Sequence, residues 1–287
     1  MKKIFCILFL VATLGIFSAC SQSIDSSESS DLRIITLGAA ITEVVAALGY
    51  GPYVVGVDRW AADTYGIYEN AIEIDMFALD IESLIALSPT KIIAASTMFA
   101  GGISPLVPLY NISSVYYVDS GDSIESIKEG ILNIGNILNS SYDAQILVDN
   151  LNNTIIQVQD AVYNLERKLV FLEIDSPPHL FTVAEGTFLN EMINIAGGIN
   201  IFGDESGWLS ITEEAVIAAN PQVILATNNW SDNLTEEISS RNGWENIDAA
   251  LNSRIYELDV NSASRANHNI AFALKQMAEA IHQITIE

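Results

Sequence analysis

Two stretches of the sequence repeat one pattern of a helix followed by a strand. Residues Glu82 to Ala95 read ESLIALSPTKIIAA, and residues Glu214 to Thr227 read EAVIAANPQVILAT. In each stretch a short helical run ends before a proline, seven residues after the glutamate, and an apolar strand-like run follows. Proline cannot continue a helix, and it biases the residue before it toward extended geometry. Two copies of one helix–strand unit predict two similar α/β lobes.

Weaker repeats extend this pattern along the chain. Residues 33–37 and 168–172 are matching apolar runs, and residues 42–49 and 188–197 are matching helical runs that end at glycine. Apolar runs alternate with helical patterns, which is typical of mostly parallel sheets with helices on their faces. We expect strands at 33–37, 53–57, 91–95, 114–118, 168–174, 222–226 and 254–258, and helices at 41–48, 81–87, 123–138, 187–196, 212–219, 235–240 and 267–284.

A single long helix is expected between the lobes. Residues 142–167 contain no proline or glycine, and their apolar residues keep a helical period along one face. Such a helix would be roughly 40 Å long, enough to run the length of one lobe. The predicted organisation is therefore an N-terminal lobe at 32–141, an inter-lobe helix at 142–167 and a C-terminal lobe at 168–287. A rigid connection of this kind limits lobe motion and leaves a ligand cleft between the lobes.

The first residues form a targeting signal. Lys2 and Lys3 precede an apolar run of about 14 residues, which is too short to span a membrane and suits a signal peptide. Residues 17–20 read FSAC and resemble the lipobox of bacterial lipoproteins, whose cysteine is acylated and becomes the new N-terminus. We expect a signal peptide at 1–19, then lipidated Cys20 and a flexible, Ser-rich tether at 20–31. An ordinary cleaved signal with a chance cysteine is the alternative.

Composition excludes several classes of function. The formal net charge is −24, and loss of the two lysines in residues 1–19 makes the mature charge about −26. A surface this acidic repels nucleic acid and anionic lipid, so contact with the membrane is expected through the lipid anchor only. The mature chain keeps one cysteine, Cys20, and has no phosphate-binding loop, no nucleophile elbow and no His-Glu-x-x-His zinc motif. An enzyme is therefore the less favoured reading.

Several short motifs follow one another along nearly the whole mature chain. They are RIITLGAAITE at 33–43, ALG at 47–49, VVGVD at 54–58, IESLIALSP at 81–89, the helix at 188–198, AANP at 218–221, Trp244, RIY at 254–256, and Ser264 with Arg265. In this order they resemble the ABC-importer binding proteins for cobalamin, ferric siderophores and haem. The first loop departs from the family, because Gly38 to Ile41 stand where its members more often have Ser/Asn-Pro-Ser-Ala. The resemblance implies an extracytoplasmic protein at the cell surface or in the periplasm, which delivers a small metal chelate to a permease dimer with a cytoplasmic ATPase.

The resemblance also implies a docking role for the repeat glutamates. In the family, one exposed glutamate on each lobe pairs with arginines of the permease, and Glu82 and Glu214 stand at the matching positions. Two like charges at a fixed separation can orient a protein on a two-fold basic receptor. Glu213 is adjacent to Glu214 and is an alternative docking residue. Ordinary solvated glutamates in the first turn of a helix are the competing interpretation.

The ligand is expected at loops that follow the carboxyl ends of the strands, where open α/β sheets bind their ligands. Aromatic rings on such loops suit a flat macrocycle or a catecholate. Some of these rings are expected to close over the lobe cores instead. His268 is a weaker candidate than His179 for reaching the chelated metal, and no cofactor of the protein's own is expected. The candidate ligand residues are Arg59, Trp60, Tyr65, Met98, His179, Phe181, Trp208, Trp230 and Arg265.

The charges of these loops bear on the identity of the ligand. Arg59 and Arg265 are the only arginines in them, among several aspartates and glutamates. This balance favours a neutral or weakly charged complex over a trianionic one. A corrinoid, a hydroxamate siderophore and a partly protonated haem all satisfy this condition. The family resemblance implies an iron complex, a ferric siderophore or haem, with a corrinoid as the alternative. A surface lipoprotein without a transport role is a more remote alternative function.

Overall fold

The N-terminal lobe is built on a five-stranded parallel sheet. The computed structural model describes residues 31–99, 102, 104–119, 121–227 and 233–286. The strand order is β3-β2-β1-β4-β5, so that β1 lies in the middle. The elements are β1 (Ile34–Leu37), α1 (Ala39–Ala47), η1 (Gly51–Tyr53), β2 (Val54–Asp58), η2 (Arg59–Ala61), β3 (Ile72–Ile74), α2 (Ile81–Ala86), β4 (Lys91–Ala95), η3 (Ser96–Phe99), η4 (Val107–Leu109), β5 (Ser114–Val118) and α3 (Ile124–Ile137).

The C-terminal lobe has a four-stranded parallel sheet in the order β11-β10-β6-β8, and an antiparallel pair formed by β7 and β9. Its core packs Phe171, Val216, Ile224 and Trp244 together, with Trp244 fully buried. The elements are β6 (Lys168–Glu173), β7 (Phe181–Val183), α5 (Phe188–Ile195), β8 (Gly198–Asn200), β9 (Trp208–Ser210), α6 (Glu213–Ala219), β10 (Val223–Ala226), α7 (Leu234–Ser239), η5 (Trp244–Asn246), α8 (Asp248–Leu251), β11 (Ile255–Glu257), α9 (Val260–Ser264) and α10 (Ile270–His282).

The two sheets share one strand order, which confirms the prediction of two similar lobes. Every strand of the second sheet has a counterpart in the first sheet: the order β8-β6-β10-β11 corresponds to β2-β1-β4-β5. In both sheets the order reverses beside the first strand of the lobe, between β1 and β4 and between β6 and β10. The crevice outside the carboxyl ends at such a reversal is where open α/β sheets bind ligands. The repeat seen in the sequence is therefore part of a larger repeat that covers four parallel strands in each lobe.

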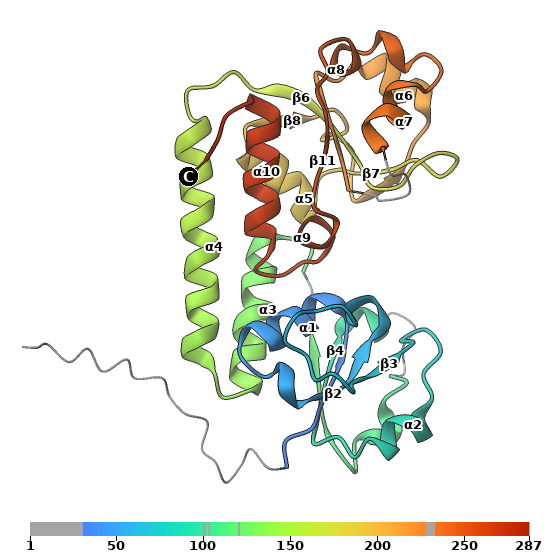
Figure 1. The fold of residues 1–287 in the computed structure, drawn as a ribbon, viewed down its shortest axis with the longest axis vertical. Helices are drawn as coiled ribbons and strands as arrows, with labels where there is room; N and C mark the ends of the chain where they lie inside the picture. The colour runs from blue at the N-terminus through green and yellow to red at the C-terminus, as the bar shows by residue number, and fades with distance from the viewer. Residues whose placement is uncertain (1–30, 100–101, 103, 120, 228–232, 287) are drawn as a thin grey trace, which may run out of the picture. The chain divides into compact units, whose positions relative to one another are not determined.

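The long helix α4 (Ser141–Val162) connects the lobes. It packs against α3 of the N-terminal lobe and against α5 and α10 of the C-terminal lobe, and Figure 1 shows α3 and α10 beside it. Gly135 lets α3 and α4 approach closely, because a Cβ there would lie 2.3 Å from the Cβ of Ala144. The helix ends at Val162, before the expected Arg167, and residues 163–167 form the turn that leads into β6. The domain boundaries at 142 and 167 stay predictions.

Short elements account for the other differences from the sequence-based prediction. Strands β3, β7, β8 and β9 were not predicted, and each has three residues. Three residues are too few for a period of two to stand out from a turn. The expected helix at 267–284 begins at Ile270, and a separate short helix, α9, precedes it. Among the described helices, none has the length and apolar character needed to cross a membrane.

Candidate functional site

The repeat glutamates occupy equivalent positions in α2 and α6. The side chain of Asp80 caps α2 and accepts from the backbone N–H of Glu82 at 3.1 Å, while the side chain of Thr212 caps α6. Glu82 and Glu214 are therefore each the second residue of a helix, and both are exposed. Their negative charge is favourable so close to a helix N-terminus. Glu213 is the first residue of α6 and therefore corresponds to Ile81, the first residue of α2.

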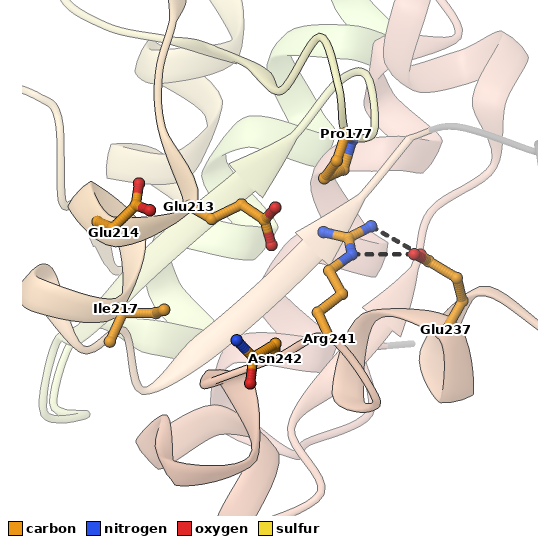
Figure 2. A pocket seen from close by; sticks show the side chains of 7 residues that line it. All are labelled: Pro177, Glu213, Glu214, Ile217, Glu237, Arg241 and Asn242. Atoms are coloured by element: carbon orange, nitrogen blue, oxygen red, sulfur yellow. Dashed lines mark hydrogen bonds and ion pairs between the residues drawn. The ribbon is translucent and has the colours of Figure 1, made fainter.

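A cavity of about 290 Å³ lies beside Glu214. Figure 2 shows the side chain of Glu213 extending toward Arg241, whereas Glu214 points away from it. Glu213 is half-buried, so Glu214 is the more accessible of the two carboxylates. The cavity is lined by Pro177, Glu213, Glu214, Ile217, Glu237, Arg241 and Asn242.

Arg241, which lines this cavity, forms a charge network with two glutamates. It donates to Glu173 at 2.5 and 2.9 Å and to Glu237 at 2.7 and 3.0 Å, and its guanidinium lies 4.7 Å from the ring centre of Trp244. Burial opposes its charge, but the hydrogen bonds to Glu173 and Glu237 raise the pKa of Arg241 overall. Ser176 donates to Glu173 at 2.9 Å. The network therefore fixes the start of the segment that follows β6.

That segment leads to a stacked aromatic pair, Phe181 and Trp208. The antiparallel pairing of β7 with β9 places Phe181 opposite Ser210 and Val183 opposite Trp208. The two rings lie 6.4 Å apart with an interplanar angle of 12°, and Trp208 is 46% exposed. His179 lies on the segment just before β7 and is exposed. Phe181 and Trp208 therefore form one group on this pair of strands, and His179 lies two residues before Phe181.

Trp60 lies on a segment whose backbone is tightly held. The buried carboxylate of Asp58 accepts from the N–H of Trp60 at 2.9 Å, and burial raises the pKa of Asp58. Arg59 pairs with Asp75 at 2.8 Å, and its guanidinium lies 5.0 Å from the ring centre of Trp60. The indole itself is 59% exposed. The segment therefore exposes the aromatic ring of Trp60, while Arg59 is paired with an aspartate of the same lobe.

A larger cavity of about 450 Å³, which we call the inter-lobe cavity, is lined by side chains of both lobes. Arg265 is ion-paired there with Glu43 of α1 and donates to the carbonyl oxygen of Trp60 at 2.7 Å. Burial lowers the pKa of His268, and the nearby charge of Glu43 partly opposes this shift. The lining residues are Glu43, Ala46, Ala47, Asp63, Thr64, Tyr65, Asn261, Arg265, His268 and Asn269.

Met98 is the remaining candidate that the structure describes. Met98 is half-buried in η3 and packs against the core of the N-terminal lobe, so part of its side chain serves packing. Trp230 and Cys20 lie outside the described residues. Within the residues that are described, no group of three or more His, Cys, Asp and Glu side chains is arranged to hold a metal ion.

Some polar residues of these sites were not predicted from the sequence. Asn267 and Asn269 donate to Glu43 at 2.6 and 2.8 Å, across more than two hundred residues of sequence. Glu173 and Arg241 are likewise far apart in the chain and buried together. One signal was available: a glutamate in the middle of the apolar helical run at 39–47 needs partners if it is buried.

Comparisons with known proteins agree with this architecture. The family model described as periplasmic binding protein matches residues 34–261. An ABC transporter substrate-binding lipoprotein of Bacillus subtilis, YvrC, is 26% identical over 92% of this chain and 87% of its own length. The high-affinity heme uptake system protein IsdE of Staphylococcus aureus is 22% identical over 90% of each chain.

A solved structure shows the same fold. It is that of a possible iron-binding (periplasmic solute-binding) protein from Staphylococcus epidermidis, with a TM-score of 0.75 and 28% identity, covering 87% of this chain and 98% of that one. The chain described here belongs to the periplasmic binding protein family. It is a substrate-binding protein of the kind that serves ABC importers, and not an enzyme.

Proposed function

We propose that this protein captures an iron complex of low net charge, haem or a ferric siderophore, and delivers it to the permease of an ABC importer. The observation that carries the proposal is the stacked pair of Phe181 and exposed Trp208, held on two hydrogen-bonded strands. Rigid aromatic side chains offer a large contact area to a flat chelate at a low cost in entropy.

The charges around these rings support a weakly charged ligand. Both arginines predicted for the cleft are paired with carboxylates of the protein, Arg59 with Asp75 and Arg265 with Glu43. An arginine that already has a carboxylate partner gives little further stabilisation to an anionic ligand. The names of two relatives, a heme uptake protein and a possible iron-binding protein, point to the same class of ligand.

The experiment is a titration of tryptophan fluorescence with haemin, a hydroxamate and a catecholate ferric siderophore, cobalamin and free ferric ion. We expect saturable quenching by one iron chelate and none by free ferric ion. Trp208→Ala should weaken that binding about tenfold or more, since a buried aromatic contact is lost. Tyr163→Ala is the matched control, because Tyr163 is an 83% exposed aromatic beyond the end of α4. Quenching by cobalamin alone would replace the iron complex with a corrinoid.

We also propose that Glu82 and Glu214 dock the protein on the permease. The support is their equivalent register in α2 and α6 and their exposure. Glu214 is preferred over Glu213, which is half-buried and extends toward Arg241 (Figure 2).

The proposed location is outside the cell membrane, with a lipid on Cys20 after removal of residues 1–19. One relative is itself named as a lipoprotein. Cys20→Ser should move the protein from the membrane fraction to the soluble fraction. Continued sedimentation of this variant with membranes would contradict lipid anchoring.

A further inference from the structure

Glu43 is the centre of a set of polar contacts that joins the two lobes. It lies on α1, is 9% exposed, and its carboxylate accepts from three side chains of the C-terminal lobe: Arg265, Asn267 at 2.6 Å and Asn269 at 2.8 Å. A carboxylate this buried is tolerated only when its oxygens are hydrogen-bonded. These three donors fulfil that requirement from one short segment, residues 265–269.

Arg265 also reaches a second segment of the N-terminal lobe. One amino group of its guanidinium binds Glu43, while the other donates to the carbonyl oxygen of Trp60 at 2.7 Å and lies 3.6 Å from a carboxylate oxygen of Asp63. The planar guanidinium has a fixed geometry, so the two contacts fix the position of Trp60 relative to α1.

The backbone of Trp60 is consequently held on both sides. Its N–H donates to Asp58 and its carbonyl oxygen accepts from Arg265. Its indole ring stays 59% exposed. The indole of Trp60 therefore loses little conformational entropy when a ligand stacks on it. In this way Arg265 can strengthen ligand binding without contacting the ligand.

We propose that Arg265 is a positioning residue: with Glu43 it fixes the segment that presents Trp60 and sets the spacing of the two lobes, and it does not itself contact the ligand. This inference rests on the proposed chelate binding in one respect only, namely that Trp60 contacts the ligand. It replaces the direct ligand role predicted for Arg265 from the sequence.

Two substitutions distinguish positioning from direct contact. Glu43→Gln removes the charge that holds Arg265 and leaves the arginine in place. If Arg265 positions Trp60, Glu43→Gln and Arg265→Ala should each weaken binding of the chelate that quenches the wild-type protein, by about tenfold. The double variant should be no weaker than the worse single variant, because both changes break one unit. If Arg265 contacts the ligand, Glu43→Gln should leave the affinity unchanged or raise it, and that result would overturn the proposal.

A second measurement needs no ligand. Hydrogen exchange of the ligand-free protein should show faster exchange in residues 59–65 in both single variants, with unchanged exchange in residues 181–183 of β7. Arg265→Lys should restore only part of the protection, since an ammonium cannot span both partners. Arg254→Ala is the matched control, because Arg254 donates to Gln283 of its own lobe. Unchanged exchange at 59–65 would refute positioning, whereas absence of chelate binding in the wild type would refute only the proposed function.

Discussion

At the scale of single residues, Arg241 and Glu173 form the most buried ion pair described, with side chains 6% and 0% exposed. Removing one partner leaves an uncompensated charge in the core. We expect Arg241→Met to lower the free energy of unfolding by about 3–5 kcal/mol, measured by urea denaturation. Arg59→Met is the control, because the Arg59–Asp75 pair is exposed and should contribute about 0–1 kcal/mol. Equal losses in the two variants would show that the buried pair has no special role.

His268 gives the protein a pH-dependent stability. Burial lowers its pKa from 6.5, so the unfolded chain takes up a proton more readily than the folded one. The stability is therefore present above about pH 6.5 and is lost as the pH falls through the lower pKa of the folded state. We expect His268→Gln to reduce the fall in unfolding free energy between about pH 7.5 and about pH 5.5. Part of the fall should remain, since burial also lowers the pKa of His282. An undiminished fall in the variant would assign the effect to other groups.

The sequence predicted exposed aromatic residues better than it predicted paired charges. Trp60, Tyr65 and Trp208 are exposed on the segments where strand-end loops were expected. In the structure Arg265 binds Glu43, 222 positions away, and the sequence did not predict this partner. A pairing at that separation leaves no local pattern, because it depends on how two finished lobes meet. Whether the predicted ligand residues contact a ligand stays a prediction.

At the scale of elements, α2 and α6 are the parts of the fold most open to a functional test. Glu82→Ala together with Glu214→Ala should abolish uptake of the chelate by cells while leaving its affinity for the purified protein unchanged, since neither residue is one of the predicted ligand residues. Each single variant should reduce uptake less than the double variant. Glu125→Ala is a suitable control, because Glu125 also lies in the first turn of a helix, α3, but outside the repeat. Loss of chelate affinity in the double variant would contradict the docking role.

The longer elements were predictable because their patterns are local. The repeat at Pro89 and Pro221 places a helix and a buried strand in each lobe, and the residues of β4 and β10 are almost entirely buried. The end of α4 was placed too late, since Leu165 continues its apolar period although the chain has already turned. The three-residue strands are stabilised by neighbouring strands rather than by their own sequence, so tertiary contacts were needed to find them.

At the scale of the whole molecule, the connection between the lobes predicts a small motion on binding. The helix α4 packs on helices of both lobes, and Glu43 joins α1 to residues 265–269. We expect the lobes to rotate by roughly a few degrees when the chelate binds. Small-angle X-ray scattering of the free and loaded protein should give radii of gyration that agree within error. A clear decrease in the radius of gyration on loading would indicate a large hinge closure. It would contradict a connection between the lobes that restricts their motion.

The proposed ligand of the cleft is an iron chelate of low net charge. The most direct test is a titration of haemin and of each ferric siderophore, followed in the visible absorbance of the chelate itself. We expect one of them to give a saturable spectral change at one chelate per protein, with a Kd below about 1 μM. A linear change without saturation for every iron chelate, from a protein shown to be folded, would contradict it.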